Sequence, residues 1–219
     1  MKSLTRTGKI TIGLYLLFVI VYAATSNARL LKQSSDTHFL YQARMALQGR
    51  LDLGQAAPPN MNDWAEVEYL TLKDGRTVAG AFLKAQPSKF RLLGGKLENV
   101  EQADIEKRTK KYYVSFPPFP AVVFLPLVAI MGMQVNDVVV TILLAGLVPA
   151  LLFLLLRRFA ASGDSRRSEA DDLWLTAMFG IGSVFYYSSV GGQVWYTAHI
   201  VSNVLVVTMM LAAQGGRRP

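Results

Sequence analysis

The sequence of 219 residues has no cysteine, which excludes disulfide bonds, thiol catalysis and cysteine-based zinc sites. Motifs for other common chemistries are absent as well. There is no cluster of metal ligands at a typical spacing, no nucleophile elbow and no glycine-rich phosphate loop. The pairs Gly94-Gly95 and Gly191-Gly192 are typical of turns instead. No single motif therefore indicates a reaction.

Charged residues are scarce, at 17% of the chain, whereas hydrophobic residues make up 52%. This balance is too apolar for an ordinary soluble domain and indicates a membrane protein. The net charge of +8 does not favour a nucleic-acid partner, because the Lys and Arg residues gather at the ends of hydrophobic runs, where they orient membrane spans. We expect no binding of nucleic acid.

Four hydrophobic runs predict transmembrane helices, which need roughly 20 residues each. They are Ile10 to Thr25, Val138 to Leu156, Leu173 to Tyr187, and Val194 to Ala213. The first run also has the features of a secretory signal peptide, because it ends in the small residues Ser26-Asn27-Ala28. The hydrophobic runs that follow favour an uncleaved anchor.

The run Ala121 to Met133 is shorter and contains Pro126, which favours an interfacial helix over a fifth span. With four spans and the N-terminus in the cytoplasm, the arginine-rich loop around Arg166 and the C-terminus also lie in the cytoplasm, as the positive-inside rule requires. The segment between the first two spans then lies outside. The prediction is a multi-pass protein of the cell (inner) membrane.

An amphipathic helix is predicted soon after the first span. Asp36 occupies the position of a helix N-cap, and Gly49 is a typical stop. Between them apolar residues recur at helical spacing, namely Phe39, Leu40, Ala43, Ala46 and Leu47. The helix is expected to lie along the outer surface of the membrane with the Asp36 carboxylate at its start. Asn136 and Asp137 are interpreted in the same way, as a cap for the second span.

The segment that follows is predicted to form a small β module. Its two hairpins turn at Asp74-Gly75 and at Gly94-Gly95. A fifth strand from about Ile105 to Tyr112 would close them into a barrel without exposed edges. The pattern around the first hairpin resembles small SH3-like or Sm-like barrels. The alternative is a solvated loop with a double hairpin.

The expected fold class is an α-helical multi-pass membrane protein with four transmembrane helices, interfacial helices and a small inserted β-barrel or double hairpin. The expected segments are a first transmembrane helix (1–28), an outer-loop amphipathic helix and linker (29–65), the β module (66–113), a Pro-rich interfacial helix (114–135) and three further transmembrane helices (136–219).

Three stretches, which lie outside the β module except for its last residue, resemble in their order and spacing the N-terminal part of integral-membrane glycosyltransferases of the GT-C superfamily that use polyprenyl-phosphate sugars. They are Asp36-Thr37-His38-Phe39-Leu40-Tyr41 with Gln48-Gly49-Arg50, then Tyr113-Val114-Ser115-Phe116-Pro117-Pro118-Phe119-Pro120-Ala121 with Leu125-Pro126-Leu127, and Phe185-Tyr186-Tyr187-Ser188 with His199. Enzymes of this superfamily have more spans, so the resemblance implies a fragment, a form that has lost catalysis, or a chain that needs a further membrane subunit.

The resemblance implies an inverting transfer of a hexosyl or pentosyl group, in which Asp36 is the general base on an acceptor hydroxyl. Such a base contributes roughly 10²–10⁴ in rate. The leaving lipid phosphate needs a cation, for which Lys111 is a candidate. His38, Tyr113 and His199 are the other expected substrate contacts. The donor lipid and the membrane lipids are the expected partners, and a divalent metal is left open as a cofactor.

Several of these residues also have a plain structural explanation. Asp36 then only caps a helix, His199 only forms hydrogen bonds at the interface, and Tyr113 only ends the β module. The alternative function is accordingly a non-catalytic membrane anchor that presents the β module to a partner or a glycan.

Overall fold

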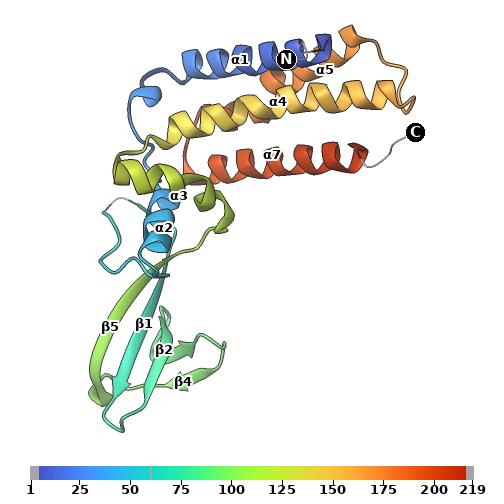
Figure 1. Ribbon diagram of the computed structural model, residues 1–219. Helices are drawn as coiled ribbons and strands as arrows, with labels where there is room; N and C mark the ends of the chain where they lie inside the picture. Colours follow the sequence, from blue (N-terminus) through green and yellow to red (C-terminus); the bar gives the residue numbers. More distant parts are fainter. Residues whose placement is uncertain (1–4, 60, 216–219) are drawn as a thin grey trace. The chain divides into compact units, whose positions relative to one another are not determined.

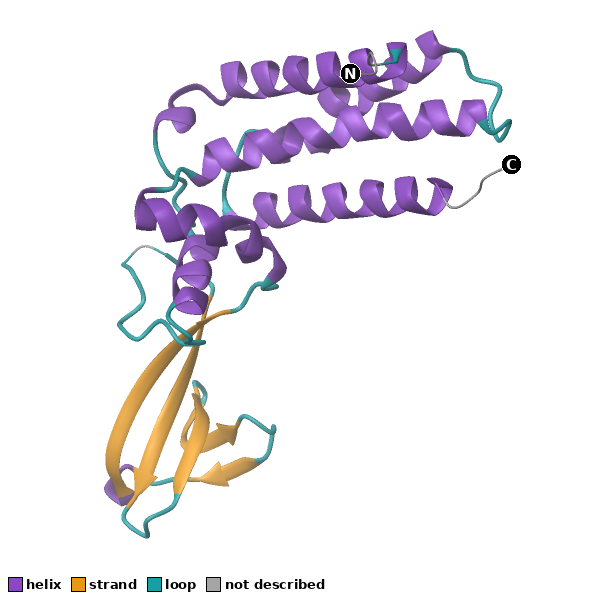
Figure 2. Ribbon diagram, in the orientation of Figure 1, coloured by secondary structure: helices purple, strands orange, loops and turns teal. Residues whose placement is uncertain are grey.

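The computed structural model describes residues 5–59 and 61–215, and the chain divides into two compact units. The helical unit consists of Met1–Thr37 together with Gln134–Pro219. The inserted unit is His38–Met133, and it contains all the described strands together with two α-helices. Figure 2 distinguishes the helices from the strands.

The helical unit is built from apolar helices. Three stretches are long and apolar enough to cross a membrane: α1 continued by a short 3₁₀ helix, α4 and α7. Figure 1 shows α4 lying alongside both α1 and α7. These helices agree with the expected membrane association. The elements of the unit are α1 (Arg6–Ser26), η1 (Asn27–Leu31), α4 (Asp137–Ala161), α5 (Glu169–Gly182), α6 (Val184–Ser189) and α7 (Val194–Gly215).

The predicted span from Leu173 to Tyr187 is not one continuous helix. It is divided between α5, of 14 residues, and α6, of 6 residues, by extended backbone at Ser183. The Ser183 hydroxyl accepts a hydrogen bond from the Phe185 amide and so begins α6. Gly182 and Ser183 favour this break because glycine weakens a helix and serine caps one. Neither helix alone has the length of a span, so four continuous spans are not confirmed.

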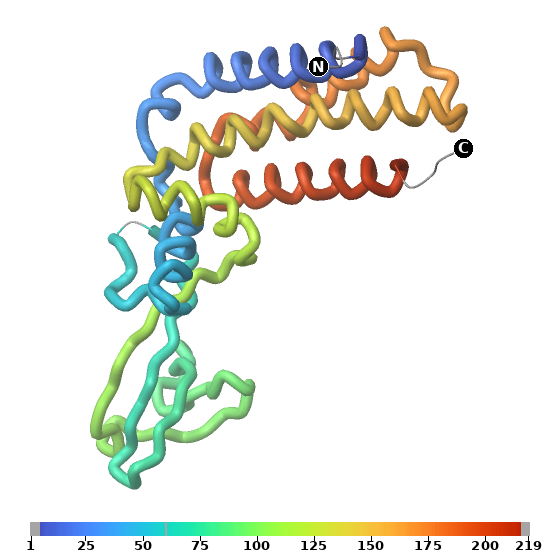
Figure 3. Tube along the Cα trace, in the orientation of Figure 1, coloured from blue at the N-terminus to red at the C-terminus, as the bar shows by residue number. Residues whose placement is uncertain are grey.

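The α5–α6 pair nevertheless follows α4 from one end to the other. Near the C-terminal end of α4, Arg157 Nη1 lies 2.9 Å from Oδ2 of Asp172, in the first turn of α5. At the N-terminal end of α4, the backbone of Gly192 lies so close that an added Cβ would stand 2.5 Å from Val138 Cγ2. We call these the Arg157 end and the Asp137 end of the helical unit. Figure 3 traces the chain between them.

Small residues allow the helices of this unit to approach closely. A Cβ added to Gly146 would lie 2.5 Å from Val19 Cγ2, and one added to Gly180 would lie 2.2 Å from the Phe18 ring. The Tyr22 hydroxyl donates to the Gly180 carbonyl oxygen at 2.9 Å. Helix α1 is therefore packed against both α4 and α5. The core around these contacts includes Ile142, Ala145, Val148, Phe185, Ile200 and Val207.

Ion pairs gather at the Arg157 end. The Asp172 carboxylate is fully buried and accepts hydrogen bonds from Arg157 at 2.9 Å and Arg167 at 2.8 Å. Arg6, at the start of α1, pairs with Glu169 at 2.8 Å. Arginines that the sequence predicted to mark one membrane face therefore lie at one end of the helices.

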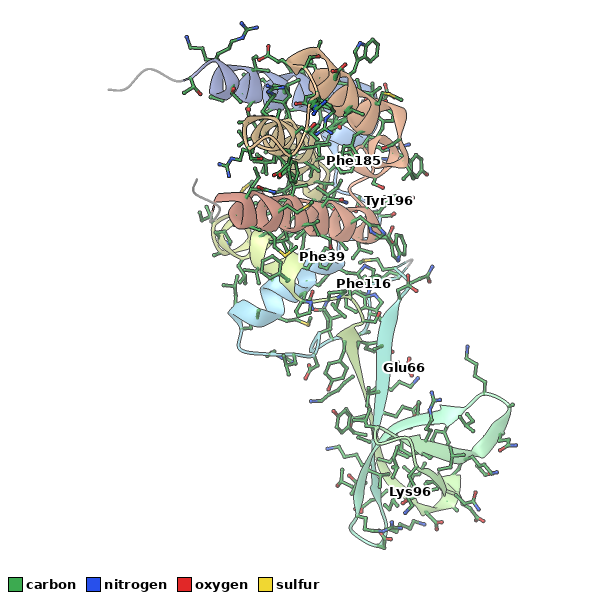
Figure 4. The ribbon with its side chains drawn as sticks, turned by 90° about the vertical axis from the view of Figure 1, so that its right-hand side faces the viewer. Phe39, Glu66, Lys96, Phe116, Phe185 and Tyr196 are labelled. Atoms are coloured by element: carbon green, nitrogen blue, oxygen red, sulfur yellow. The ribbon has the colours of Figure 1, made fainter. Side chains whose placement is uncertain are left out.

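The two helices of the inserted unit, α2 (His38–Leu47) and α3 (Phe119–Met131), pack against each other through aromatic side chains. The Phe39 ring lies 6.2 Å from that of Phe116 and 6.5 Å from that of Phe124, between ring centroids. Figure 4 labels Phe39 and Phe116. Helix α3 continues through Pro126 but has only 13 residues. This length fits the expected interfacial helix better than a span.

The strands β1 (Trp64–Leu72), β2 (Thr77–Leu83), β3 (Gln86–Leu92), β4 (Leu97–Asn99) and β5 (Ile105–Val114) form one antiparallel sheet in the order β4-β3-β2-β1-β5. Both predicted hairpins are present. Gly75 (φ +84°) lies in the first turn and Gly95 (φ +86°) in the second. Leu70, Leu72, Phe90 and Val100 form a small hydrophobic core in this unit.

The predicted closure into a barrel is not found. Strand β5 pairs with β1 from Trp64 opposite Val114 to Leu72 opposite Ile105. Strand β4 has only three residues and pairs with β3. Among the described residues the sheet is therefore open, with β4 and β5 at its edges. Several lysine and arginine side chains along β5 discourage pairing with a further strand.

Candidate functional site

A cavity of about 300 Å³ lies at the Asp137 end of the helical unit. The loop after η1, the start of α4 and the connection from α6 to α7 each contribute to it. Its volume is at the lower end of the range for small-ligand sites, about 300–1,000 Å³. The lining residues are Arg29, Lys32, Gln33, Ser34, Ser35, Val138, Tyr187, Gly191, Gln193 and Tyr196.

Two residues at the start of α4 hold the loop side of the cavity. Asp137 is only 4% exposed, and its carboxylate accepts the Ser34 amide at 2.8 Å and the Ser34 hydroxyl. Asn136 donates through Nδ2 to the Leu30 carbonyl oxygen at 2.9 Å, and its Oδ1 accepts the Val139 amide. Asn136 is thus the cap that the sequence predicted. Asp137 instead fixes the position of Ser34.

Asp36 lies beside this lining. The Ser35 hydroxyl donates to Asp36 Oδ2 at 2.6 Å, and the Asp36 amide donates to Ser34 Oγ at 3.2 Å. The second bond forms a serine turn, which holds Asp36 outside the helix that follows. Helix α2 begins at His38, so Thr37, and not Asp36, occupies the position before it. The cap prediction was wrong by one residue.

All the charged side chains that line the cavity are positive. Arg29 and Lys32 supply two cations, and none of the lining residues is acidic. Serine hydroxyls and the side-chain amides of Gln33 and Gln193 also line it. Cations beside neutral hydrogen-bond donors bind phosphate or carboxylate groups well. The lining can therefore hold an anionic group with the Asp36 carboxylate close by.

Two tyrosines form the aromatic side of the cavity. The rings of Tyr187 and Tyr196 meet edge to face, with centroids 5.4 Å apart. The backbone of Gly191 passes so close to Tyr196, which Figure 4 labels, that an added Cβ would lie 2.5 Å from ring atom Cδ2. The Thr197 hydroxyl bonds to the Gly192 carbonyl oxygen at 3.0 Å. The predicted glycine turn therefore brings the start of α7 to the cavity.

His199 lies on α7, one turn after Tyr196, and its side chain is exposed. It does not line the cavity. The Asn203 side chain donates to the His199 carbonyl oxygen at 2.8 Å, so the two residues lie one turn apart on α7. The structure thus places His199 on the same helix as the site without bringing it into the site.

His38 is fully buried in the inserted unit. Its Nε2 lies 2.7 Å from the Asn62 carbonyl oxygen, and its ring centroid lies 4.7 Å from that of Trp64 and 5.2 Å from that of Phe116. Its Nδ1 has no hydrogen-bond partner in the part of the chain that the structure describes. His38 is therefore part of an aromatic core.

Lys111 and Tyr113 lie together on β5, and both have partners. Lys111 Nζ is 3.1 Å from Asp52 and 5.2 Å from the centre of the Tyr69 ring. The Tyr113 and Tyr69 hydroxyls are 2.9 Å apart, and this hydrogen bond, with burial, raises the pKa of Tyr113 to about 12. Hydrogen bonds from Arg50 and then Lys111 lower the pKa of Asp52. Lys111 therefore already has a carboxylate partner, which it shares with Arg50.

The five predicted site residues thus fall in both units: Asp36 and His199 in the helical unit, and His38, Lys111 and Tyr113 in the inserted unit. The sequence prediction missed most of the cavity lining. One signal was available for part of it, because two cations precede Ser34-Ser35-Asp36 directly after a hydrophobic run. The missed residues include Arg29, Lys32, Gln193 and Tyr196.

Comparisons with protein-family models, with curated proteins and with solved structures find no match. Within residues 5–59 and 61–215, no three His, Asp or Glu side chains come together as metal ligands would. The geometry of the cavity is therefore the basis for inferring a function.

Proposed function

We propose that the protein is a membrane glycosyltransferase, or the N-terminal portion of one, that transfers a sugar from a polyprenyl-phosphate donor. The observation that carries this proposal is the cationic cavity beside the Asp36 carboxylate. A phosphate site and a candidate base next to each other are what such a transfer needs. The choice of reaction rests on the resemblance to the GT-C superfamily.

In this mechanism Arg29 and Lys32 bind the donor phosphate and stabilise the negative charge that grows on it as the bond to the sugar breaks. The electron pair of that bond leaves with the phosphate. Asp36 takes the proton of the acceptor hydroxyl, whose oxygen attacks the sugar from the opposite face and inverts its configuration. Tyr187 and Tyr196 offer aromatic surface to the sugar ring.

The α5–α6 pair serves as a fourth crossing of the membrane in this proposal. Together the two helices are about 30 Å long at the rise of an α-helix, which matches the hydrocarbon thickness. A broken helix is tolerated at that depth where protein covers it, and α5 packs against α4. The termini and the Arg157 end then lie in the cytoplasm, and the cavity faces the outer side of the inner membrane.

The test is complementation of a strain that lacks the protein, with envelope glycans measured by mass spectrometry. Asp36→Asn keeps the shape of the side chain but removes the base, so we expect transfer to fall by roughly 10²–10⁴ with membrane insertion unchanged. Asp104→Asn removes an exposed carboxylate of the inserted unit and should leave transfer intact. Wild-type transfer by Asp36→Asn would refute the proposed role of Asp36.

A non-catalytic anchor is the second candidate. It is favoured by the internal contacts of His38, Lys111 and Tyr113, which build the inserted unit and leave its sheet as a presented surface. In that case Asp36→Asn is silent. Gly75→Val, at a turn position with φ of +84°, disrupts the first hairpin and abolishes the phenotype. The two candidates therefore give opposite results in the same strain.

A further inference from the structure

Two cavities meet in the inserted unit. The first, of about 180 Å³, is polar and is lined by Tyr41, Arg44, Gln48, Arg50 and Gln55, among others. The second, of about 440 Å³, is mostly apolar and is lined by Leu47, Val128, Ala129 and Met133 together with Arg44 and Gln48. Arg44 and Gln48 line both cavities, so a polar and an apolar part form one continuous surface.

The polar part carries an excess of positive charge. Arg50 Nη2 lies 2.6 Å from Asp52 Oδ1, but the same carboxylate also pairs with Lys111 at 3.1 Å. Arg44 has no acidic partner among the residues that the structure describes. Arg50 and Lys111 therefore share one carboxylate, and Arg44 adds a further positive charge to the lining. Two guanidinium groups beside a small polar cavity suit the oxygens of a phosphate group.

The backbone after α2 positions Arg50. Gly49 (φ +66°) ends the helix, and the Arg50 amide donates to the Met45 carbonyl oxygen at 2.9 Å, as in a Schellman cap. Gly54 (φ +71°) then passes so close that an added Cβ would lie 2.3 Å from Arg50 Nη2. The guanidinium of Arg50 is therefore placed by two glycine turns and an ion pair.

The apolar part is a groove between α2 and α3. Contact of its apolar side chains with water is unfavourable. Leu47 beside it is 50% exposed, and Ile130 and Met131 at the end of α3 are 84% and 52% exposed. The chain continues from here into α4, an apolar helix long enough to span a membrane, which begins at Asp137. Exposed apolar side chains a few residues before a span in the sequence indicate contact with lipid.

We propose that this surface binds one anionic phospholipid of the bilayer. The headgroup phosphate lies against Arg44 and Arg50, and one acyl chain lies in the groove between α2 and α3. The continuity of the two cavities at Arg44 and Gln48 matches the amphiphilic shape of such a lipid, and the surplus of cations selects an anionic headgroup. This site belongs to the inserted unit and does not depend on the function proposed above.

The test is native mass spectrometry of the full chain purified in mild detergent. We expect bound phosphatidylglycerol in the wild type. Arg44→Gln/Arg50→Gln should bind about thirtyfold less of it, because the variant loses the attraction of two surface cations. Lys84→Gln/Lys89→Gln makes the same change of charge in the β2–β3 hairpin and should retain the lipid. Ala129→Phe fills the groove, leaves both arginines in place, and should also lose the lipid.

Titration of the delipidated wild type with different ligands distinguishes a lipid headgroup from a free phosphate as the bound group. Phosphatidylglycerol should bind about thirtyfold more tightly than phosphatidylcholine, and on the order of a hundredfold more tightly than glycerol phosphate, which lacks the acyl chains. Equal binding of phosphatidylcholine would overturn the headgroup assignment. Equal binding of glycerol phosphate would instead assign a site for free phosphate. Retention of lipid by both the double variant and Ala129→Phe would overturn the proposal as a whole.

Discussion

One buried carboxylate connects the start of α4 to the loop that lines the candidate cavity. Asp137 accepts two hydrogen bonds from Ser34, and Ser34 in turn accepts the Asp36 amide. The position of Asp36 therefore depends on a residue that makes no direct contact with the proposed substrate. Removal of either partner in this chain leaves a donor or an acceptor unsatisfied.

We expect Asp137→Ala to lower the stability of the protein by roughly 1–3 kcal/mol, the usual cost of an unsatisfied buried polar group. Thermal unfolding of the full chain in detergent measures the effect. Glu106→Gln, at an exposed position of β5, is the control and should unfold like the wild type. An unchanged midpoint for Asp137→Ala would show that the loop does not need this anchor.

The Tyr69–Tyr113 pair makes stability depend on pH. The pKa of Tyr113 is raised to about 12 in the folded protein, above the ordinary value of about 10 for an unfolded chain. The contribution of the pair is therefore complete below about pH 10 and is lost as the pH rises towards about 12. Denaturant unfolding across this window should show the loss. The loss of stability with pH should be smaller in Tyr69→Phe than in the wild type. Identical curves of stability against pH for the two proteins would argue against the hydrogen bond.

Among the elements, the close contact of α1 with α4 depends on a glycine. Gly146 faces Val19, whose β-branched side chain has little freedom to move. Gly13, on α1 itself, has no atom within 4 Å of the position of an added Cβ. Gly13 therefore lies outside the contact and is a matched control for Gly146 on the partner helix.

Gly146→Ala should destabilise the helical unit by roughly 1–3 kcal/mol through overpacking. Gly13→Ala should have no such effect and should stabilise α1 by up to about 1 kcal/mol, because alanine is the better helix former. Thermal unfolding in the same detergent compares them. Equal midpoints for the two variants would mean that α1 and α4 do not touch at Gly146.

Local patterns in the sequence were enough for several elements. Both hairpins were predicted correctly from Asp74-Gly75 and Gly94-Gly95. The end of α2 was predicted from Gly49 and the start of α4 from Asn136. Closure of the sheet was not predictable in this way, because it depends on the length of β4. The break at Ser183 was also missed, since one serine hardly changes the hydropathy of a run.

The candidate site was the least predictable feature. Its lining joins the loop around Lys32 to the residues around Tyr196, and only the packing of α4 against its neighbours brings these distant segments together. The burial of His38 among aromatic rings was equally hidden, because a histidine near a predicted helix start has no distinguishing pattern. Asp36 was predicted because it follows a hydrophobic run, and the structure places it beside the lining without including it.

For the whole molecule, we expect four crossings of the membrane. Reporter fusions at Gly54, at Gly163 and after the C-terminus check this on the full chain. We expect Gly54 outside, and both Gly163 and the C-terminus in the cytoplasm. Gly54 and Gly163 on the same side would contradict the crossing by α4. A C-terminus on the outer side would show that α5 and α6 do not cross.

The most direct test of the central claim is binding of a short polyprenyl phosphate, farnesyl phosphate, to the full chain in lipid nanodiscs, followed by its ³¹P signal. We expect Arg29→Gln/Lys32→Gln to weaken binding roughly tenfold or more, whereas Lys84→Gln/Lys89→Gln, an equal loss of charge in the inserted unit, leaves it unchanged. Unchanged binding in the first variant would contradict the claim that the cavity at the Asp137 end holds the donor phosphate.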